Sequence, residues 1–170
     1  MPESIDDIGA RISRTDTSVG EGLCGVFKEL AEEHGELTLM MRNTAESSNK
    51  GRRRNLYPEI RRRLLAHEYG ELKELYPALS IYDGMREMAA THSEDTFELA
   101  AMIKELDSLP LDGERWTEQF QMLIELVIQH VFQEETEFFP KALDRIGKDE
   151  AERLRGFYES AKLDALNQLG

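Results

Sequence analysis

Apolar residues recur every three or four positions along most of the chain, the spacing that places them on one face of a helix. The two-residue alternation typical of strands is absent from the sequence. The spacing predicts five helices, over about residues 18–46, 57–76, 81–106, 113–143 and 149–166. Because the connections are short, we expect an all-α fold, an antiparallel up-down-up-down four-helix bundle with an additional short C-terminal helix.

Prolines and glycines indicate where the helices should begin and end. The second helix should begin near Tyr57-Pro58, because proline suits a first helical turn, and should stop at Tyr76-Pro77. Gly147 is a helix-stop signal, and Asp149 is a plausible cap of the last helix. The 170 residues suffice for a single domain, 1-170, whose bundle core spans about residues 20-145.

Polar residues interrupt the apolar seams at positions that should face the core. In helix order, the seams contain His34; His67 and Glu71; His92 and Thr96; His130 and Glu134. All four histidines of the chain therefore lie on core-facing stripes, one in each long helix. Burying an ionised carboxylate in such a seam is costly unless another group pairs with it.

The histidines are also expected to lie at one height in the bundle. In an antiparallel hairpin, residues equidistant from the turn lie at similar heights. The midpoints between successive histidines fall within SSNKGRRR, PALSIYDG and LPLDGE, all three of them predicted turns. Glu71 and Glu134 each follow a histidine by four residues, so each projects from the same face as that histidine.

Four imidazoles and two carboxylates in one buried layer suit two metal ions bridged by carboxylates. Nitrogen and oxygen donors without a thiolate favour iron, with manganese or zinc as alternatives. The opposing interpretation is that each histidine is a hydrogen-bonded core residue without a ligand.

Charge and cysteine content narrow the choice of partners. The net charge of −13 argues against nucleic acid. Residues 50–63 carry seven basic side chains against one acidic one, which we interpret as a solvated loop and helix start, with a phosphate or partner contact as the alternative.

The single cysteine, Cys24, suits a reducing cytoplasm. No apolar run is long enough to span a bilayer, and the N-terminus lacks the apolar core of a signal peptide.

Four stretches around the polar positions carry a resemblance to a known family. They are LAEEHGEL around His34, LLAHEYGELKELYPAL around His67, ATHSEDTFELAAMI around His92 and LVIQHVFQEETEFFPKAL around His130. Together they resemble the hemerythrin-like domains of the bacterial HHE cation-binding type, over about residues 20 to 145. The resemblance implies a four-helix bundle that holds two non-haem irons.

The resemblance also implies a role for each candidate ligand. Glu71 and Glu134 would bridge the two irons. His34 and His67 would bind one iron, and His92 and His130 the other.

One position departs from the family pattern. Invertebrate oxygen carriers have a fifth histidine one turn after the histidine of the third helix, where this chain has Thr96. This departure argues against simple reversible carriage of oxygen. Glu68 is the candidate substitute ligand, since some family members have a carboxylate there. Water could instead occupy that coordination position, and Glu68 would then be an exposed helix charge. Asp95 is a less favoured substitute, because it is rotated off the stripe.

Members of the family bind dioxygen, sense oxygen or iron, handle nitric oxide or peroxide, or help to repair iron centres. We therefore expect a di-iron protein that binds or senses dioxygen or a related small oxidant. One alternative is a di-iron enzyme that turns over peroxide or nitric oxide. Another is a metal-free helical interaction domain.

Overall fold

The computed structural model describes residues 22–170 apart from residue 48, and this part of the chain is helical without strands, as predicted. In chain order, its elements are α3 (Gly25–Glu46), α4 (Lys50–Gly70), η1 (Glu71–Leu75), α5 (Tyr76–Leu79), α6 (Arg86–Asp107), α7 (Glu114–Gln133), η2 (Glu134–Phe138), α8 (Phe139–Ile146) and α9 (Lys148–Leu169). The elements η1 and η2 are single π-helical turns inside longer helices. No helix among the described residues is long and apolar enough to cross a membrane.

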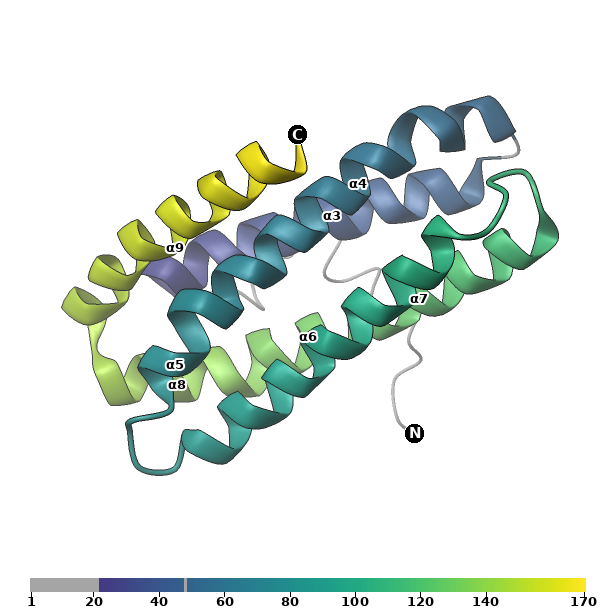
Figure 1. Ribbon diagram of the computed structural model, residues 1–170. Helices are drawn as coiled ribbons and strands as arrows, with labels where there is room; N and C mark the ends of the chain where they lie inside the picture. Colours follow the sequence, from purple (N-terminus) through teal and green to yellow (C-terminus); the bar gives the residue numbers. More distant parts are fainter. Residues whose placement is uncertain (1–21, 48) are drawn as a thin grey trace, which may run out of the picture.

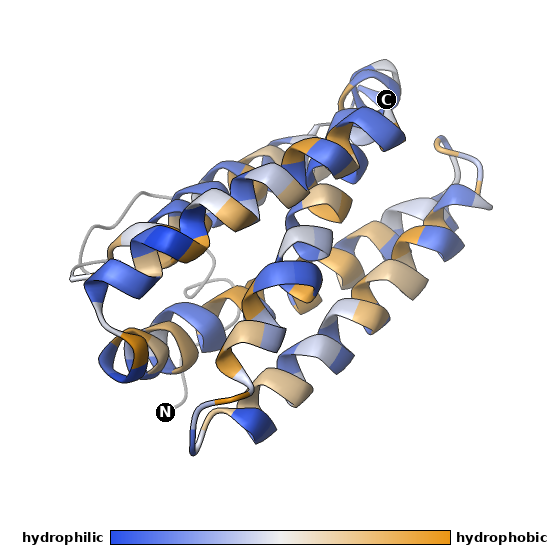
Figure 2. Cartoon of the chain, turned by 60° about the vertical axis from the view of Figure 1, so that its left-hand side comes forward, coloured by the Kyte–Doolittle hydropathy of each residue, from blue (hydrophilic) through white to orange (hydrophobic). Residues whose placement is uncertain are grey.

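Four long helices lie alongside one another, and α9 packs on the outside of α3 and α4 (Figure 1). Contacts join α3 to α4 and α7, and α6 to α7 and α4, which closes the bundle. The α3–α4 and α6–α7 connections lie at one end of the molecule, and the α5–α6 connection lies at the other (Figure 1). Each helix carries both hydrophobic and hydrophilic positions, as Figure 2 shows.

The buried apolar residues form two clusters, with a polar layer between them. One cluster joins the C-terminal parts of α3 and α6 to the N-terminal part of α4 and to most of α7. It includes Met41, Ile60 and Trp116. The other lies beyond the layer and includes Phe27, Phe138 and Tyr158. The polar layer therefore occupies the middle of the bundle, where apolar packing closes it from both ends.

Two predicted helix starts were wrong, and a third lies outside the described residues. The second long helix begins at Lys50, not near Tyr57, because the Asn49 side chain accepts the backbone N–H groups of two residues in the first turn. Pro58 thus lies inside α4. The third begins at Arg86, not at residue 81, after a turn in which Gly84 has a φ of +80°. The start predicted at residue 18 falls outside the described residues, and α3 begins at Gly25.

The other helix ends also differ from the prediction. Pro77 does not stop the second helix, which continues through η1 and α5 to Leu79. Gly147, with a φ of +80°, separates α8 from α9 as expected. However, α9 runs over Lys148–Leu169, and Asp149 lies in its first turn without capping it.

The basic segment 50–63 forms the first part of α4, so the helix start in its interpretation was confirmed and the loop was wrong. Arg53 donates to the hydroxyl of Thr117 at 2.8 Å, and its guanidinium lies over a tryptophan ring of α7. Arg61 donates through Nε to both carboxylate oxygens of Asp107, at 2.9 and 3.0 Å. These bonds connect the start of α4 to the α6–α7 end of the bundle.

Candidate metal centre

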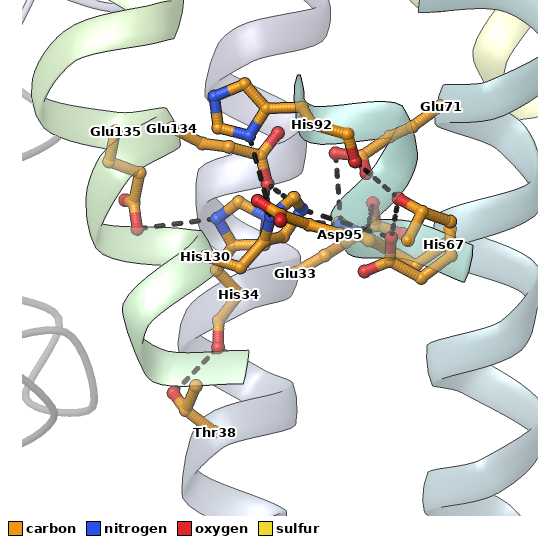
Figure 3. Close-up of polar contacts among 12 residues, drawn as sticks. Glu33, His34, Thr38, His67, Glu71, His92, Asp95, His130, Glu134 and Glu135 are labelled. Atoms are coloured by element: carbon orange, nitrogen blue, oxygen red, sulfur yellow. Dashed lines mark hydrogen bonds and ion pairs between the residues drawn. The ribbon is translucent and has the colours of Figure 1, made fainter. Parts of the chain in front are cut away.

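The four histidines meet in the middle of the bundle (Figure 3). The Nε2 atoms of His34 and His67 lie 3.1 Å apart. The Nδ1 atoms of His92 and His130 lie 3.5 Å apart. All four side chains are buried. The structure therefore brings together the layer of imidazoles that the helix spacing predicts.

Glu71 and Glu134 lie between the two histidine pairs. Glu71 Oε1 is 3.3 Å from His67 Nε2, and Glu134 Oε1 is 2.9 Å from His130 Nε2. Glu134 Oε1 also lies 3.8 Å from His34 Nε2, so this carboxylate faces both pairs. Both glutamates are fully buried.

Three groups of donor atoms are compact enough to hold a metal ion. Within each group, one ligand atom per residue lies within 4.8 Å of the others. The groups are His34, His67 and Glu71; His92, His130 and Glu134; and Glu68, Glu71 and His130. Because the third group shares a residue with each of the others, the donor groups adjoin one another.

The buried polar atoms of this layer fit a cation. Glu71 Oε1, Glu134 Oε1 and His130 Nε2 are buried and lack a well-aligned hydrogen bond within the described part of the chain, although Glu134 Oε1 and His130 Nε2 lie 2.9 Å apart. Buried polar atoms without a partner cost free energy. A cation held between these atoms would satisfy all three of them.

A π-helical turn begins at each of the two central glutamates. In η1 the N–H of Tyr76 donates to the carbonyl of Glu71, and in η2 the N–H of Phe139 donates to the carbonyl of Glu134. In both cases a proline follows the glutamate by six residues. Proline removes an N–H and crowds the carbonyl four residues earlier, which a π turn accommodates by adding a residue.

The two π turns reveal a local repeat that our sequence analysis missed. The pattern His-x3-Glu-x5-Pro occurs at residues 67–77 and again at 130–140. The proline positions were a usable signal, but we interpreted the first of them as a helix stop.

Carboxylates outside the layer contact the outer ring nitrogens of three histidines. The pairs are His34 with Glu135, His67 with Glu33, and His130 with Asp95, each with a nitrogen–oxygen distance of 3.4 Å. Such contacts orient an imidazole and keep its other nitrogen free for a metal. Sequence reasoning missed Glu33 and Glu135 and considered Asp95 only as a substitute ligand, because these residues lie off the apolar stripes that we followed.

Two tyrosines add hydroxyl groups to the centre. Tyr158 of α9 lies 3.2 Å from His67 Nδ1 and donates to Glu33 Oε2 at 2.6 Å. Tyr76 donates to Glu71 Oε2 at 2.8 Å, and its oxygen is 3.5 Å from Glu134 Oε2. Helix α9 therefore contributes directly to the surroundings of one histidine.

Glu68 is buried, with 6% of its surface exposed, so its interpretation as an exposed helix charge was wrong. Its Oε2 lies 4.0 Å from His130 Nε2. The Thr96 hydroxyl donates to the same oxygen at 2.7 Å. The Glu68 carboxylate thus lies next to the His130 imidazole and is held there by the Thr96 hydroxyl. Its role as a ligand stays a prediction.

Burial and mutual repulsion separate the proton affinities of the two central carboxylates. Burial and the charge of Glu71 raise the pKa of Glu134 to about 7. Burial acts in the same direction on Glu71, but the charge of His67 outweighs it and lowers the Glu71 pKa to about 2. Burial and the charge of His130 lower the pKa of His92 to about 4, which favours the neutral, metal-binding imidazole.

Comparisons with known proteins identify related sequences. The family model of the hemerythrin HHE cation-binding domain matches residues 25–142. A DNA nickase of Nostoc sp. (strain PCC 7120 / SAG 25.82 / UTEX 2576) is 19% identical over 138 residues, which are 81% of this chain and 39% of the nickase. The chain thus spans about two fifths of the length of this relative. No solved structure matches the chain.

Proposed function

The chain belongs to the hemerythrin HHE cation-binding family, and we propose that it is a non-haem di-iron protein that binds or senses dioxygen or a related small oxidant. The observation that carries the proposal is the set of adjoining buried donor groups around Glu71 and Glu134. Imidazole and carboxylate donors without a thiolate favour iron over softer metals. The capacity of two bridging carboxylates to serve two ions supports a pair.

In this proposal each histidine serves one ion, and Glu71 and Glu134 each also contact the other ion. His34, His67 and Glu71 hold the first ion. His92, His130 and Glu134 hold the second, with Glu68 in the position that Thr96 cannot fill. When bound between these residues, an iron pair would supply redox chemistry toward a small oxidant. The apolar clusters on either side exclude bulk water from the layer.

We extend the proposal to the whole chain as a single up-down-up-down domain in the cytoplasm. The alternation of the connections between the two ends supports the topology (Figure 1). Packing of α9 on α3 and α4 supports its inclusion in the same domain. The free Cys24 suits a reducing compartment.

Iron analysis tests the proposal directly. Protein purified aerobically should contain two irons per chain and should show an absorption band that is absent after chelation. The variant His67→Ala/His130→Ala is the matched control, and it should lose both the iron and the band. Pure wild-type protein that is metal-free and refuses reconstitution would instead support the metal-free interaction domain.

An enzyme that turns over peroxide or nitric oxide is the second candidate. Threonine in place of a fifth imidazole favours it, because Glu68 or water must then complete the second metal position. Stopped-flow spectroscopy of the reduced protein separates the two functions. A binder gives one lasting spectral change per site, whereas an enzyme consumes oxidant over many cycles.

We propose small oxidants and not nucleic acid as the partners, although the related protein from Nostoc is named a DNA nickase. The net charge of −13 opposes binding to DNA. Within the basic segment, Arg53 and Arg61 are engaged with residues of the same chain. Incubation with supercoiled plasmid should therefore leave it uncut, with and without added metal.

A further inference from the structure

A pocket of about 460 Å³ opens between α4, α6 and the end of α9. Its walls are mainly apolar, with Leu65 and Leu72 on one side, Ala100 on another, and Ala165 and Leu169 on the third. A largely apolar cavity of this size can admit small uncharged molecules. The apolar walls of the pocket contrast with the chain as a whole, whose net charge is −13.

Two polar side chains separate this pocket from the histidine layer. Glu68 and Thr96 both line the pocket, yet each is almost fully buried. They are joined by the 2.7 Å hydrogen bond from the threonine hydroxyl. Glu68 Oε2 lies 4.0 Å from His130 Nε2. The carboxylate therefore borders the pocket on one side and the candidate metal centre on the other.

Exposed apolar side chains gather around the pocket. Among the described residues, eight large apolar side chains are exposed, and three of them, Tyr69, Phe97 and Leu169, line this pocket. Phe97 is 65% exposed. Exposed apolar groups that cluster in one place mark a site of interaction more often than isolated ones do.

We propose that this pocket is the entry port by which an uncharged apolar oxidant reaches the second metal position, with the Glu68–Thr96 pair as its inner barrier. Apolar walls favour gases such as dioxygen and nitric oxide over water and ions. No Lys, Arg or His of the described part of the chain lines the pocket to attract an anion. The choice of oxidant rests on the proposed function, whereas the affinity of the pocket for apolar gas does not.

Xenon tests the pocket without any reaction at the metals. Xenon is an apolar gas that occupies apolar cavities. Crystals of the zinc-loaded full chain, pressurised with xenon, should show an anomalous peak between Ala100 and Leu169. In Ala100→Trp the indole fills the same space, and the peak should disappear. Wild-type crystals without xenon in the pocket would overturn the proposal.

Entry kinetics supply the second measurement. Ala100 follows Thr96 by one helical turn. Ala100 and its neighbour Ala101 are both exposed, but only Ala100 lines the pocket. Reduced iron-loaded Ala100→Trp should combine with dioxygen and nitric oxide about tenfold more slowly than wild type, because entry then limits association. Ala101→Trp is the matched control and should react at the wild-type rate.

Iron content and a second variant keep the result interpretable. Ala100→Trp should retain the wild-type iron-to-protein ratio, and Ala100→Phe provides a smaller obstruction if the indole disturbs folding. Unchanged rates in both variants, at unchanged iron content, would show that the pocket is not the route. If the iron-loaded wild type reacts with neither gas, the proposed function fails, and the xenon measurement still decides whether the pocket admits apolar gas.

Discussion

At the scale of single residues, Glu68 and Thr96 form a unit in which only the carboxylate can reach the imidazoles. The threonine hydroxyl bonds to the carboxylate, which itself lies 4.0 Å from His130 Nε2. We therefore expect Glu68→Ala to lose about one of two metal ions, and Thr96→Ala to keep both. Metal-to-protein ratios by mass spectrometry measure the difference.

The exposed Glu94 of α6 provides a control for this pair, because its removal changes the charge without touching the layer. Glu94→Ala should match wild type in metal content. Retention of two ions by Glu68→Ala, with an unaltered absorption spectrum, would leave water as the occupant of that position.

The central glutamates give a second prediction at this scale. Glu71→Ala or Glu134→Ala should lower metal occupancy most, because each removes a carboxylate that faces the layer. Glu135 is also buried, but it lies 3.4 Å from His34 Nδ1, the outer nitrogen of that ring. Glu135→Ala should therefore cause a smaller loss.

The matched control for the glutamate series is Glu137, which is exposed on the same π turn. Glu137→Ala should bind as much metal as wild type does. Equal occupancy in all four variants would show that the assigned faces are wrong.

At the scale of elements, two glycines test how α9 is held against α4. A Cβ added to Gly70 would lie 2.6 Å from a ring carbon of Tyr158, whereas one added to Gly156 of α9 would meet nothing within 4 Å. Gly70→Ala should lower the free energy of unfolding by roughly 1–3 kcal/mol, since the ring must shift. Gly156→Ala should raise it by up to about 1 kcal/mol, because alanine favours a helix over glycine.

Chemical denaturation of both variants and wild type measures these opposite signs. The Gly70 variant should also weaken the 3.2 Å contact between the Tyr158 hydroxyl and His67 Nδ1. Equal destabilisation by both substitutions would contradict close packing of α9 at Gly70.

Helix type and buried face could be predicted from the sequence, because burial imposes a period of 3.6 residues wherever a helix packs. Leu64, Leu99 and Leu123 lie on the apolar stripes that this period gives, and all three are buried. Helix ends are harder to predict, because they depend on small free-energy differences between local signals such as caps, prolines and turns. Pro58 and Pro77 were taken as a helix start and a helix stop, but a cap at Asn49 and a π turn carry the helix past them.

Helical spacing also limits how much of the candidate site can be predicted, because it identifies only residues on the core-facing stripes. The six central histidines and glutamates lie on the stripes, so spacing alone brings them to one layer. Glu33, Asp95 and Glu135 lie off the stripes and reach the outer ring nitrogens from the side. Tyr158 reaches His67 from a fifth helix, and no spacing within α4 could predict this contact.

At the scale of the whole molecule, the polar layer interrupts an otherwise apolar core. Each of the two clusters holds the long helices together on its own side of the layer. Without a cation, burial and the charge of Glu71 raise the pKa of Glu134 to about 7, so the metal-free layer must take up a proton or admit water. The clusters can therefore preserve the bundle while the layer between them loses stability.

Metal removal should consequently lower the melting temperature without abolishing the helices. An ion that binds only the folded state adds about 4 kcal/mol to stability when its concentration is a thousand times its Kd. Calorimetry of the loaded and chelated protein should show the lower melting temperature, and circular dichroism at 25 °C should show nearly the same helix content. In His67→Ala/His130→Ala, chelator should change neither. An unchanged melting temperature in wild type would contradict a buried metal centre, because loss of a buried ion leaves the Glu71 and Glu134 carboxylates to repel each other in the core.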